Sequence, residues 1–564
     1  MVLVGGNPSR YLSPPAIVGS CMIDFDTHPD RYRHWRLSFD GPIARLELRV
    51  DPEHAFVPGK YELKLNSYDL AVDLELQDAI QRVRFSHPEA KVLVITSGHD
   101  RVFCAGANIP MLATSTHAFK VNFCKFTNET RLSLEDASRR SGIRSIAALN
   151  GTAAGGGYEL AIACDEIYLV DDGNSVVSLP EVALLGVLPG TGGLTRLVDK
   201  RKIRRDQADV FSTLAEGVRG KKAKAWGLID DSFPKSRFAE KVKERALALA
   251  ATLPDKPGPG IELGPVKPEV TDDGYRYRHV HLRIEPDRRL ATLTVDAPST
   301  PQPQTPEQFV AAGDSAWALR AFREIDDALL RLRFEHGAVG LVLLQTRGSL
   351  DAVLEVERSL HAHREHWLVN EIIAHMARVL RRYELTAKSF YAIADRGSCF
   401  AGPLLELALA GDRIYALDDP DHVVEFAVGP LSGGALPMAH GMTRLHNRFL
   451  REPERADKLL QELPRLDAAA ANDAGLVTVL ADTIDWDDEV RLAIEERLSL
   501  SPDALTGMEA SLRFGGNETC DSKIFGRLSA WQNWIFIRPN AVGPEGALTR
   551  YGQPEPARFD WNRT

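Results

Sequence analysis

Short apolar runs alternate with longer runs of helical spacing in the first part of the chain. Apolar residues recur every three to four positions in LAVDLELQDAIQRVRF (70–85), which predicts an amphipathic helix. Four short runs end in turn residues, as β-strands do: ARLELRV (44–50), KVLVITSG (91–98), IRSIAALNG (143–151) and EIYLVDD (166–172). Strands that alternate with helices predict an α/β fold in which helices cover the sheets.

The same pattern returns in the second part of the chain. ELAIACDEIY (159–168) is matched 247 residues later by ELALAGDRIY (406–415). GLTRL (193–197) is matched 248 residues later by GMTRL (441–445). Two further pairs, RVRF with RLRF and WGLID with AGLVT, keep the same order and nearly the same spacing. Shared helix composition would not hold this register, so the sequence predicts a duplicated fold.

A proline- and glycine-rich stretch, TLPDKPGPGIELGPVKPEV (252–270), separates the two copies and predicts a linker. We therefore expect five regions along the chain. They are an N-terminal extension (1–35), a catalytic domain (36–255, the first half), a linker (256–275), a degenerate copy (276–485, the second half) and a C-terminal extension (486–564) that is helical and braces the fold or forms an interface.

Composition narrows the class of protein. The 564 residues are 44% hydrophobic and 26% charged, as in a globular protein with sizeable cores, and the net charge is −10 with no long basic block. A role in coating nucleic acid is therefore disfavoured. The six cysteines contain no CxxC pair, which argues against a disulfide framework and a structural zinc site and suits a reducing cytoplasm. No apolar run approaches the ~20 residues of a membrane span, so we expect a cytoplasmic protein.

Two glycine-bearing loops follow strands in the first half, VFCAGANI (102–109) and NGTAAGGGYEL (150–160). A glycine triplet weakens regular structure, so a compensating function is expected, such as a backbone that must approach a ligand. Two converging N–H groups form an oxyanion hole, which a helix N-terminus would strengthen. In the second half, SLDAV (349–353) replaces the first loop. In the second loop, Pro403, which has no N–H, stands at the position of Gly156. We therefore expect the site in the first half.

FCAGAN, NGTAAGGGYELAIACD and LPEVALLGVLPGTGG together resemble the crotonase (enoyl-CoA hydratase/isomerase) superfamily, well over residues 40–250 and weakly over 280–480. The resemblance implies a spiral of ββα units that binds an acyl-CoA thioester. It places the oxyanion-hole amides at Ala107 and Gly156 and the catalytic carboxylates at Glu159 and Glu181. Two features depart from the hydratases. Asn108 stands where aspartate is common, and Glu181 follows Glu159 by 22 residues, a slightly wider spacing.

The degenerate copy and the tail resemble a branch of this superfamily that opens the ring of an epoxidised aromatic CoA thioester. That resemblance implies hydrolytic cleavage of 2,3-epoxybenzoyl-CoA to 3,4-dehydroadipyl-CoA semialdehyde and formate, in aerobic benzoate degradation. CoA would be part of the substrate, and neither a metal nor another cofactor is expected. Two alternatives stay open: an enoyl-CoA hydratase or isomerase with an appended domain, and a non-catalytic scaffold that binds CoA esters. A fused fatty-acid-oxidation enzyme is disfavoured because residues 280–564 contain no GxGxxG after a strand.

The remaining candidates surround this site. Cys124 lies in a predicted helix (120–140) that would border the acyl pocket, where a thiol could orient a water or donate to an intermediate, although a buried cysteine is usually only packed. Lys64 is expected to meet the CoA phosphates and Gly155 to contact the substrate. GVLPGTGG (186–193) lacks the Lys-Ser/Thr pair of a phosphate-binding loop. We expect a homodimer or another homo-oligomer.

Overall fold

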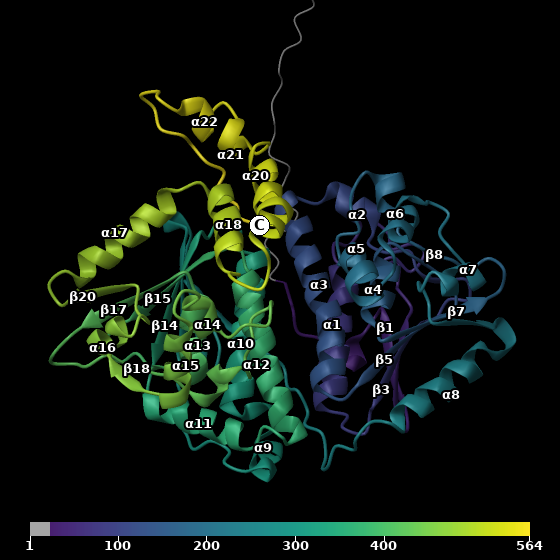
Figure 1. Ribbon diagram of the computed structural model, residues 1–564, viewed down its shortest axis with the longest axis horizontal. Helices are drawn as coiled ribbons and strands as arrows, with labels where there is room; N and C mark the ends of the chain where they lie inside the picture. Colours follow the sequence, from purple (N-terminus) through teal and green to yellow (C-terminus); the bar gives the residue numbers. More distant parts are fainter. Residues whose placement is uncertain (1–22) are drawn as a thin grey trace, which may run out of the picture.

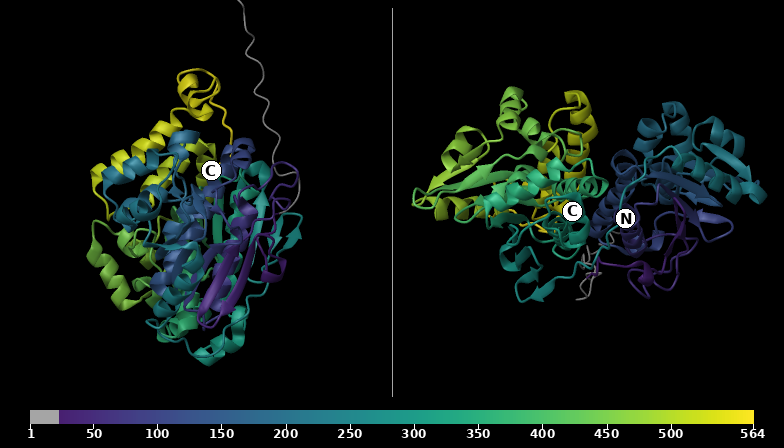
Figure 2. Two further views of the ribbon diagram at one scale, coloured as in Figure 1. Left: turned by 90° about the vertical axis from the view of Figure 1, so that its right-hand side faces the viewer. Right: turned by 90° about the horizontal axis from the view of Figure 1, so that it is seen from below.

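The computed structural model describes residues 23–564, so residues 1–22 of the predicted N-terminal extension, including Cys21, lie outside it. Two α/β halves lie side by side, and the C-terminal helices rise beside the seam between them (Figures 1 and 2). The five cysteines of the described part are free thiols. None of the helices in residues 23–564 has the length and apolarity needed to cross a membrane.

The first half is built on a six-stranded sheet in the order β1-β2-β3-β5-β7-β9. β1 and β2 pair antiparallel and the other neighbours pair parallel. The four strands predicted from the sequence correspond to β2, β3, β5 and β7. The bounds are β1 (Trp35–Asp40), β2 (Ile43–Leu48), β3 (Val92–Ser97), β5 (Arg144–Leu149), β7 (Glu166–Asp171) and β9 (Asp231–Pro234).

Helices cover both faces of this sheet. α1 (Leu70–Phe85) matches the predicted helix, and it begins where the Asp69 carboxylate accepts hydrogen bonds from the first free N–H groups. α8 (Phe238–Ala250) packs on the opposite face through a separate apolar cluster. The other helices of this half are α2 (Ile109–Thr114), α3 (His117–Arg140), α4 (Gly156–Ala163), α5 (Gly193–Thr195), α6 (Arg205–Thr213) and α7 (Gly220–Ala225).

A small three-stranded sheet stands apart from the main one and positions the site. It contains β4 (Val102–Cys104), β6 (Thr152–Ala154) and β8 (Val177–Ser178) in that order, with parallel pairing throughout. Because the three strands run in the same direction, the segments that follow them leave from one edge.

The second half has an eight-stranded sheet in the order β10-β11-β12-β13-β14-β15-β17-β20 and its own three-stranded sheet, β16-β18-β19. The predicted linker (256–275) contains β10 and the first two residues of β11. The bounds are β10 (Glu269–Thr271), β11 (Gly274–Arg276), β12 (Val280–Glu285), β13 (Leu290–Asp296), β14 (Leu341–Arg347), β15 (Ser389–Ala394), β16 (Phe400–Ala401), β17 (Arg413–Asp418), β18 (Glu425–Ala427), β19 (Arg465–Asp467) and β20 (Val479–Asp482).

The helices of the second half and of the tail complete the fold. Those of the second half are α9 (Pro306–Ala312), α10 (Trp317–Phe334), α11 (Leu350–Ala362), α12 (Trp367–Leu385), α13 (Gly402–Ala410), α14 (Arg444–Arg448), α15 (Pro453–Glu462) and α16 (Ala468–Asp473). Those of residues 486–564 are α17 (Trp486–Ser499), α18 (Pro502–Leu512), α19 (Cys520–Lys523), α20 (Ser529–Ile535), α21 (Pro539–Val542) and α22 (Ala547–Arg550).

Buried ion pairs join the two halves along the seam, where α1 and α3 face α10 and α12 (Figure 1). Arg84 of α1 contacts Glu371 of α12 at 2.6 Å and Asp136 of α3 at 3.0 Å. Arg378 of α12 contacts Asp136 at 2.8 Å. Each buried charge therefore has a partner, as an interior site requires.

Candidate active site

The three segments that carry the predicted site residues leave the same edge of the small sheet. β4 leads into the loop that contains Ala107, β6 leads into Gly155 and Gly156, and β8 is followed after two residues by Glu181. The fold therefore brings together residues that lie far apart in the sequence, at the kind of strand end where α/β proteins place their sites.

The first loop is held so that the Ala107 amide points away from its neighbouring segment. Tyr68 and Ala107 form a single parallel β-bridge. In that bridge the Tyr68 N–H donates to Gly106 O at 2.9 Å and the Asn108 N–H donates to Tyr68 O at 2.8 Å. Because paired and unpaired groups alternate along such a segment, the Ala107 N–H lies on the opposite side.

The second amide lies close to this loop. Gly156 is the first residue of α4, so no preceding helical turn can accept its N–H, and the helix N-terminus adds a partial positive charge. A Cβ built on Gly106 would lie 2.8 Å from Gly156 N, which shows how closely the two loops approach. Ala107 and Gly156 thus meet at one edge, as an oxyanion hole requires.

Each glycine of the triplet is required sterically. A Cβ on Gly155 would lie 2.7 Å from Glu181 Oε1, and Gly155 has a φ of +52°, which other residues rarely adopt. A Cβ on Gly156 would lie 2.0 Å from Tyr68 Oη, and one on Gly157 would lie 2.4 Å from Cys104 O. The backbone at the start of α4 is therefore packed directly against site groups.

Glu159 lies one turn into α4 and is 2% exposed. Its Oε1 accepts hydrogen bonds from Thr191 N–H at 2.9 Å and Gly193 N–H at 2.8 Å, and its Oε2 accepts one from the Thr191 hydroxyl. The glycine-rich run 186–193 thus fixes the orientation of a carboxylate. In the sequence this run formed part of the family resemblance and did not fit a phosphate-binding loop, and Thr191 was given no role.

Glu181 has a different environment. It is 9% exposed, it opens a short π-helical turn (Glu181–Leu185), and its Oε2 has no hydrogen-bond partner within the described residues. Burial raises the pKa of Glu181 to about 7, and the nearby Glu159 carboxylate adds to the rise. A carboxyl group that titrates near neutral pH can act as either an acid or a base. Exposed apolar side chains follow it in the sequence: Val182, Leu184, Leu185, Val187 and Leu188.

Cys124 and Tyr68 also reach this region. The Cys124 sulfur lies 3.9 Å from the position of a Cβ on Gly190, in the run that holds Glu159. Burial, followed by the effect of Glu159, raises the pKa of Cys124 to about 11, so the group is a thiol at neutral pH. Tyr68 is buried beside Gly156, and the sequence analysis did not identify it.

Lys64 and Asn108 make contacts within the protein that have ordinary structural roles. The Lys64 ammonium is 2.9 Å from Glu62, on a side chain that is 77% exposed. Asn108 caps α2, because its Oδ1 accepts from Met111 N–H at 2.9 Å, and its Nδ2 donates to Glu62 O at 2.8 Å. The asparagine therefore shapes the loop that contains Ala107, which accounts physically for its place there.

In the second half, the glutamate that corresponds to Glu159 is part of a buried cluster of ion pairs. Arg444 contacts Glu406 and Glu384, each at 2.8 Å. The Glu357 carboxylate lies 2.0 Å from the position of a Cβ on Gly402, the first residue of α13. Glu406, the counterpart of Glu159 in the second half, thus forms a buried ion pair.

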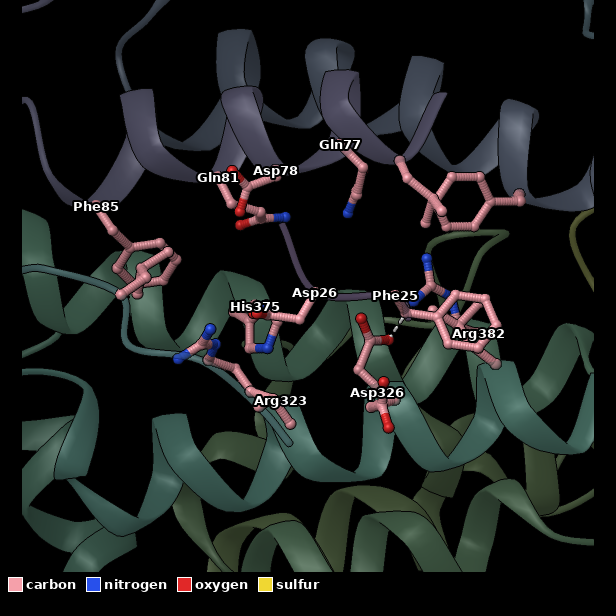
Figure 3. Close-up of a pocket in the computed structure, with 16 residues that line it drawn as sticks. Phe25, Asp26, Gln77, Asp78, Gln81, Phe85, Arg323, Asp326, His375 and Arg382 are labelled. Carbon is pink, nitrogen blue, oxygen red and sulfur yellow. Dashed lines mark ion pairs between the residues drawn. The ribbon is translucent and has the colours of Figure 1, made fainter. Parts of the chain in front are cut away.

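A polar cavity of about 110 Å³ lies between the two halves (Figure 3). It lies between α1, α10 and α12, and its lining includes Gln77, Asp326, His375 and Arg382. Arg382 lies 2.6 Å from Asp326, so these two charges neutralise each other. The cavity belongs to the seam and is separate from the Glu159 and Glu181 region.

Comparisons with known proteins bear on this site. Residues 62–257 match the enoyl-CoA hydratase/isomerase family. Benzoyl-CoA-dihydrodiol lyase of Aromatoleum evansii is 53% identical over 96% of this chain and 98% of its own length. The fatty acid oxidation complex subunit alpha of Shewanella loihica is 39% identical over 28% of this chain and 22% of its own length.

A solved enoyl-CoA hydratase of Geobacillus kaustophilus is 34% identical, with a TM-score of 0.34, and the match covers 39% of this chain and 75% of that one. The family match of residues 62–257 assigns the crotonase-like α/β fold to this part of the chain. The chain as a whole belongs to the crotonase (enoyl-CoA hydratase/isomerase) superfamily and, along almost its full length, to the family of benzoyl-CoA-dihydrodiol lyase.

Proposed function

We propose that this protein cleaves the ring of 2,3-epoxybenzoyl-CoA by adding water, giving 3,4-dehydroadipyl-CoA semialdehyde and formate, in aerobic benzoate degradation. The observation that carries the proposal is the close approach of the Gly106–Ala107 and Gly155–Gly156 segments, with two buried carboxyl groups beside them, where β4, β6 and β8 end. The likeness along almost the full chain to a benzoyl-CoA-dihydrodiol lyase supports the aromatic substrate.

The Ala107 and Gly156 amides would bind the thioester oxygen. As the ring is attacked, negative charge moves through the conjugated system to that oxygen, where two aligned N–H donors stabilise it. One donor of this kind is worth about 10²–10³ in rate. Gly155 would contact the acyl group beside Gly156, and its missing side chain leaves room for the Glu181 carboxyl group.

The two glutamates would handle water. Glu181, with a pKa of about 7 and a free Oε2, would take the proton from the attacking water. Glu159, held by Thr191 and Gly193, would position water or the opening oxygen. Cys124 would act as a thiol donor toward an intermediate, because its high pKa makes a thiolate base unfavourable. Lys64, on the exposed rim, would meet the CoA phosphates.

We infer that the second half arose by duplication and has lost its site. The Arg196–Glu135 contact at 2.8 Å in the first half has a counterpart in Arg444–Glu384 at 2.8 Å. In the second half the same arginine also binds Glu406, and Glu357 fills the space at the start of α13. This half and residues 486–564 would brace the catalytic half and support a homo-oligomer. We propose a cytoplasmic enzyme with no cofactor beyond the CoA of its substrate.

Formate release tests the proposal. The purified protein is incubated with 2,3-epoxybenzoyl-CoA and, separately, with crotonyl-CoA. We expect one formate per epoxide consumed and slow or no hydration of crotonyl-CoA. Rapid hydration of crotonyl-CoA without formate from the epoxide would instead identify an enoyl-CoA hydratase.

A further inference from the structure

Tyr68 links the two loops that form the candidate oxyanion hole. Its backbone pairs with Gly106 and Asn108 on either side of Ala107. Its side chain crosses to the other loop, where Oη, Cζ and Cε1 lie 2.0, 2.8 and 2.9 Å from the position of a Cβ on Gly156. One residue therefore touches both arms of the site.

The Tyr68 hydroxyl is a donor without an acceptor. Tyr68 is 3% exposed, and its Oη has no hydrogen-bond partner within the described residues. Leaving a buried hydroxyl unpaired is unfavourable, so a group of this kind in a site indicates a partner that binds there.

The surroundings of the ring hold it in place as a neutral phenol. The Arg131 guanidinium lies 5.0 Å from the ring centroid, and Asp73 fixes that guanidinium at 2.9 Å. Burial keeps the pKa of Tyr68 well above its usual range, although Arg131 acts in the opposite direction. The hydroxyl therefore keeps its proton and can donate it in a hydrogen bond.

The hydroxyl also has the right position along α4. Gly156 and Glu159 are three residues apart on this helix, and residues at that spacing share one face. The Tyr68 hydroxyl packs against the start of α4, beside the residue whose N–H is free within the described residues, and Glu159 lies one turn further along the same helix. A donor at this point is placed to reach an oxygen bound at the Gly156 N–H.

We propose that the Tyr68 hydroxyl is a third donor of the oxyanion hole and hydrogen-bonds the thioester oxygen of the bound acyl-CoA. This inference rests on the proposed site and deepens it by adding a catalytic side chain to two backbone amides. The hydrogen bond strengthens as the oxygen becomes negative, so it favours the transition state over the bound substrate.

The variant Tyr68→Phe tests this role. A hydrogen bond to a charged oxygen corresponds to a loss of about 10- to 100-fold in kcat. We expect this loss with KM changed by less than about threefold, because the CoA contacts are unaffected. Tyr158→Phe is the matched control. Tyr158 lies on α4 and is buried, as Tyr68 is, but its hydroxyl donates a hydrogen bond to Leu228 O at 2.7 Å. We therefore expect no change in kcat per folded enzyme.

A binding measurement separates this inference from the proposed reaction. With 4-aminobenzoyl-CoA as the probe, polarisation of the carbonyl shifts the absorbance of the bound ester to longer wavelength. We expect Tyr68→Phe to reduce that shift and fluorotyrosine at position 68, a stronger donor of nearly the same volume, to increase it. An unchanged shift, or a kcat within twofold of the parent, would overturn the inference, while a failure of the parent enzyme to release formate would count against the reaction alone.

Discussion

The pKa of Glu181 leads to a sharp prediction about pH. Glu181 is 9% exposed with one oxygen unpartnered, and burial together with Glu159 raises its pKa to about 7. A base is active when ionised, so activity should rise with pH. For a pKa of 7, roughly one hundredth of the groups are ionised at pH 5 and about nine-tenths at pH 8. We therefore expect kcat/KM to rise about 90-fold over this range and then level off.

The variant Glu181→Gln should abolish this rise of kcat/KM with pH. It should also lower kcat/KM at pH 8 by a factor of about 10²–10⁴, the usual contribution of a general base. Formate release at pH 5 to 9 provides the assay, with a thermal melt at each pH to confirm folding. Glu357→Gln is the matched control, because Glu357 is a buried carboxyl of the second half whose pKa burial raises to about 8. The rise of kcat/KM with pH in Glu357→Gln should match that of the parent enzyme. If the rise persists in Glu181→Gln, or disappears in Glu357→Gln, the assignment of Glu181 as the base is refuted.

Three further predictions concern the loops and the seam. Gly156→Ala places a Cβ 2.0 Å from Tyr68 Oη and must displace the amide, so kcat should fall about 10²–10³-fold in a steady-state assay; a change below threefold would contradict this. Thr191→Ala removes the hydroxyl that holds Glu159 and should lower kcat roughly tenfold with KM nearly constant; a change confined to KM would contradict the positioning role. Arg84→Met removes a partner of two buried carboxylates, Asp136 and Glu371. It should lower the free energy of unfolding, measured in urea, by about 3–5 kcal/mol without changing kcat of the folded enzyme. An unchanged unfolding midpoint would show that the seam does not depend on these ion pairs.

Local patterns predicted much of the first half. The helical spacing of 70–85 corresponds to α1, which buries one apolar face, and the apolar run at 91–98 corresponds to β3, which is buried on both faces. The glycine triplet predicted a backbone packed against a site, and each of its glycines is in fact sterically required.

Long-range contacts could not be predicted in the same way. Thr191 holds Glu159 from 32 residues away, and only the folded loop shows that its N–H and hydroxyl point at a carboxylate. Tyr68 precedes the helix cap Asp69, so its position in the sequence suggests a helix start and gives no sign of Gly156. The contact between Arg84 and Glu371 joins residues 287 positions apart, a distance at which charge pattern carries no pairing information.

The central claim is that the Ala107 and Gly156 amides bind the thioester oxygen between two working carboxyl groups. A crystal structure of the Glu159→Gln, Glu181→Gln double variant with benzoyl-CoA tests it most directly, because the inactive site retains its ligand. The account predicts the carbonyl oxygen within about 3 Å of both nitrogens, with the ring between positions 159 and 181. An acyl group bound elsewhere, with the two amides facing apart, would contradict it.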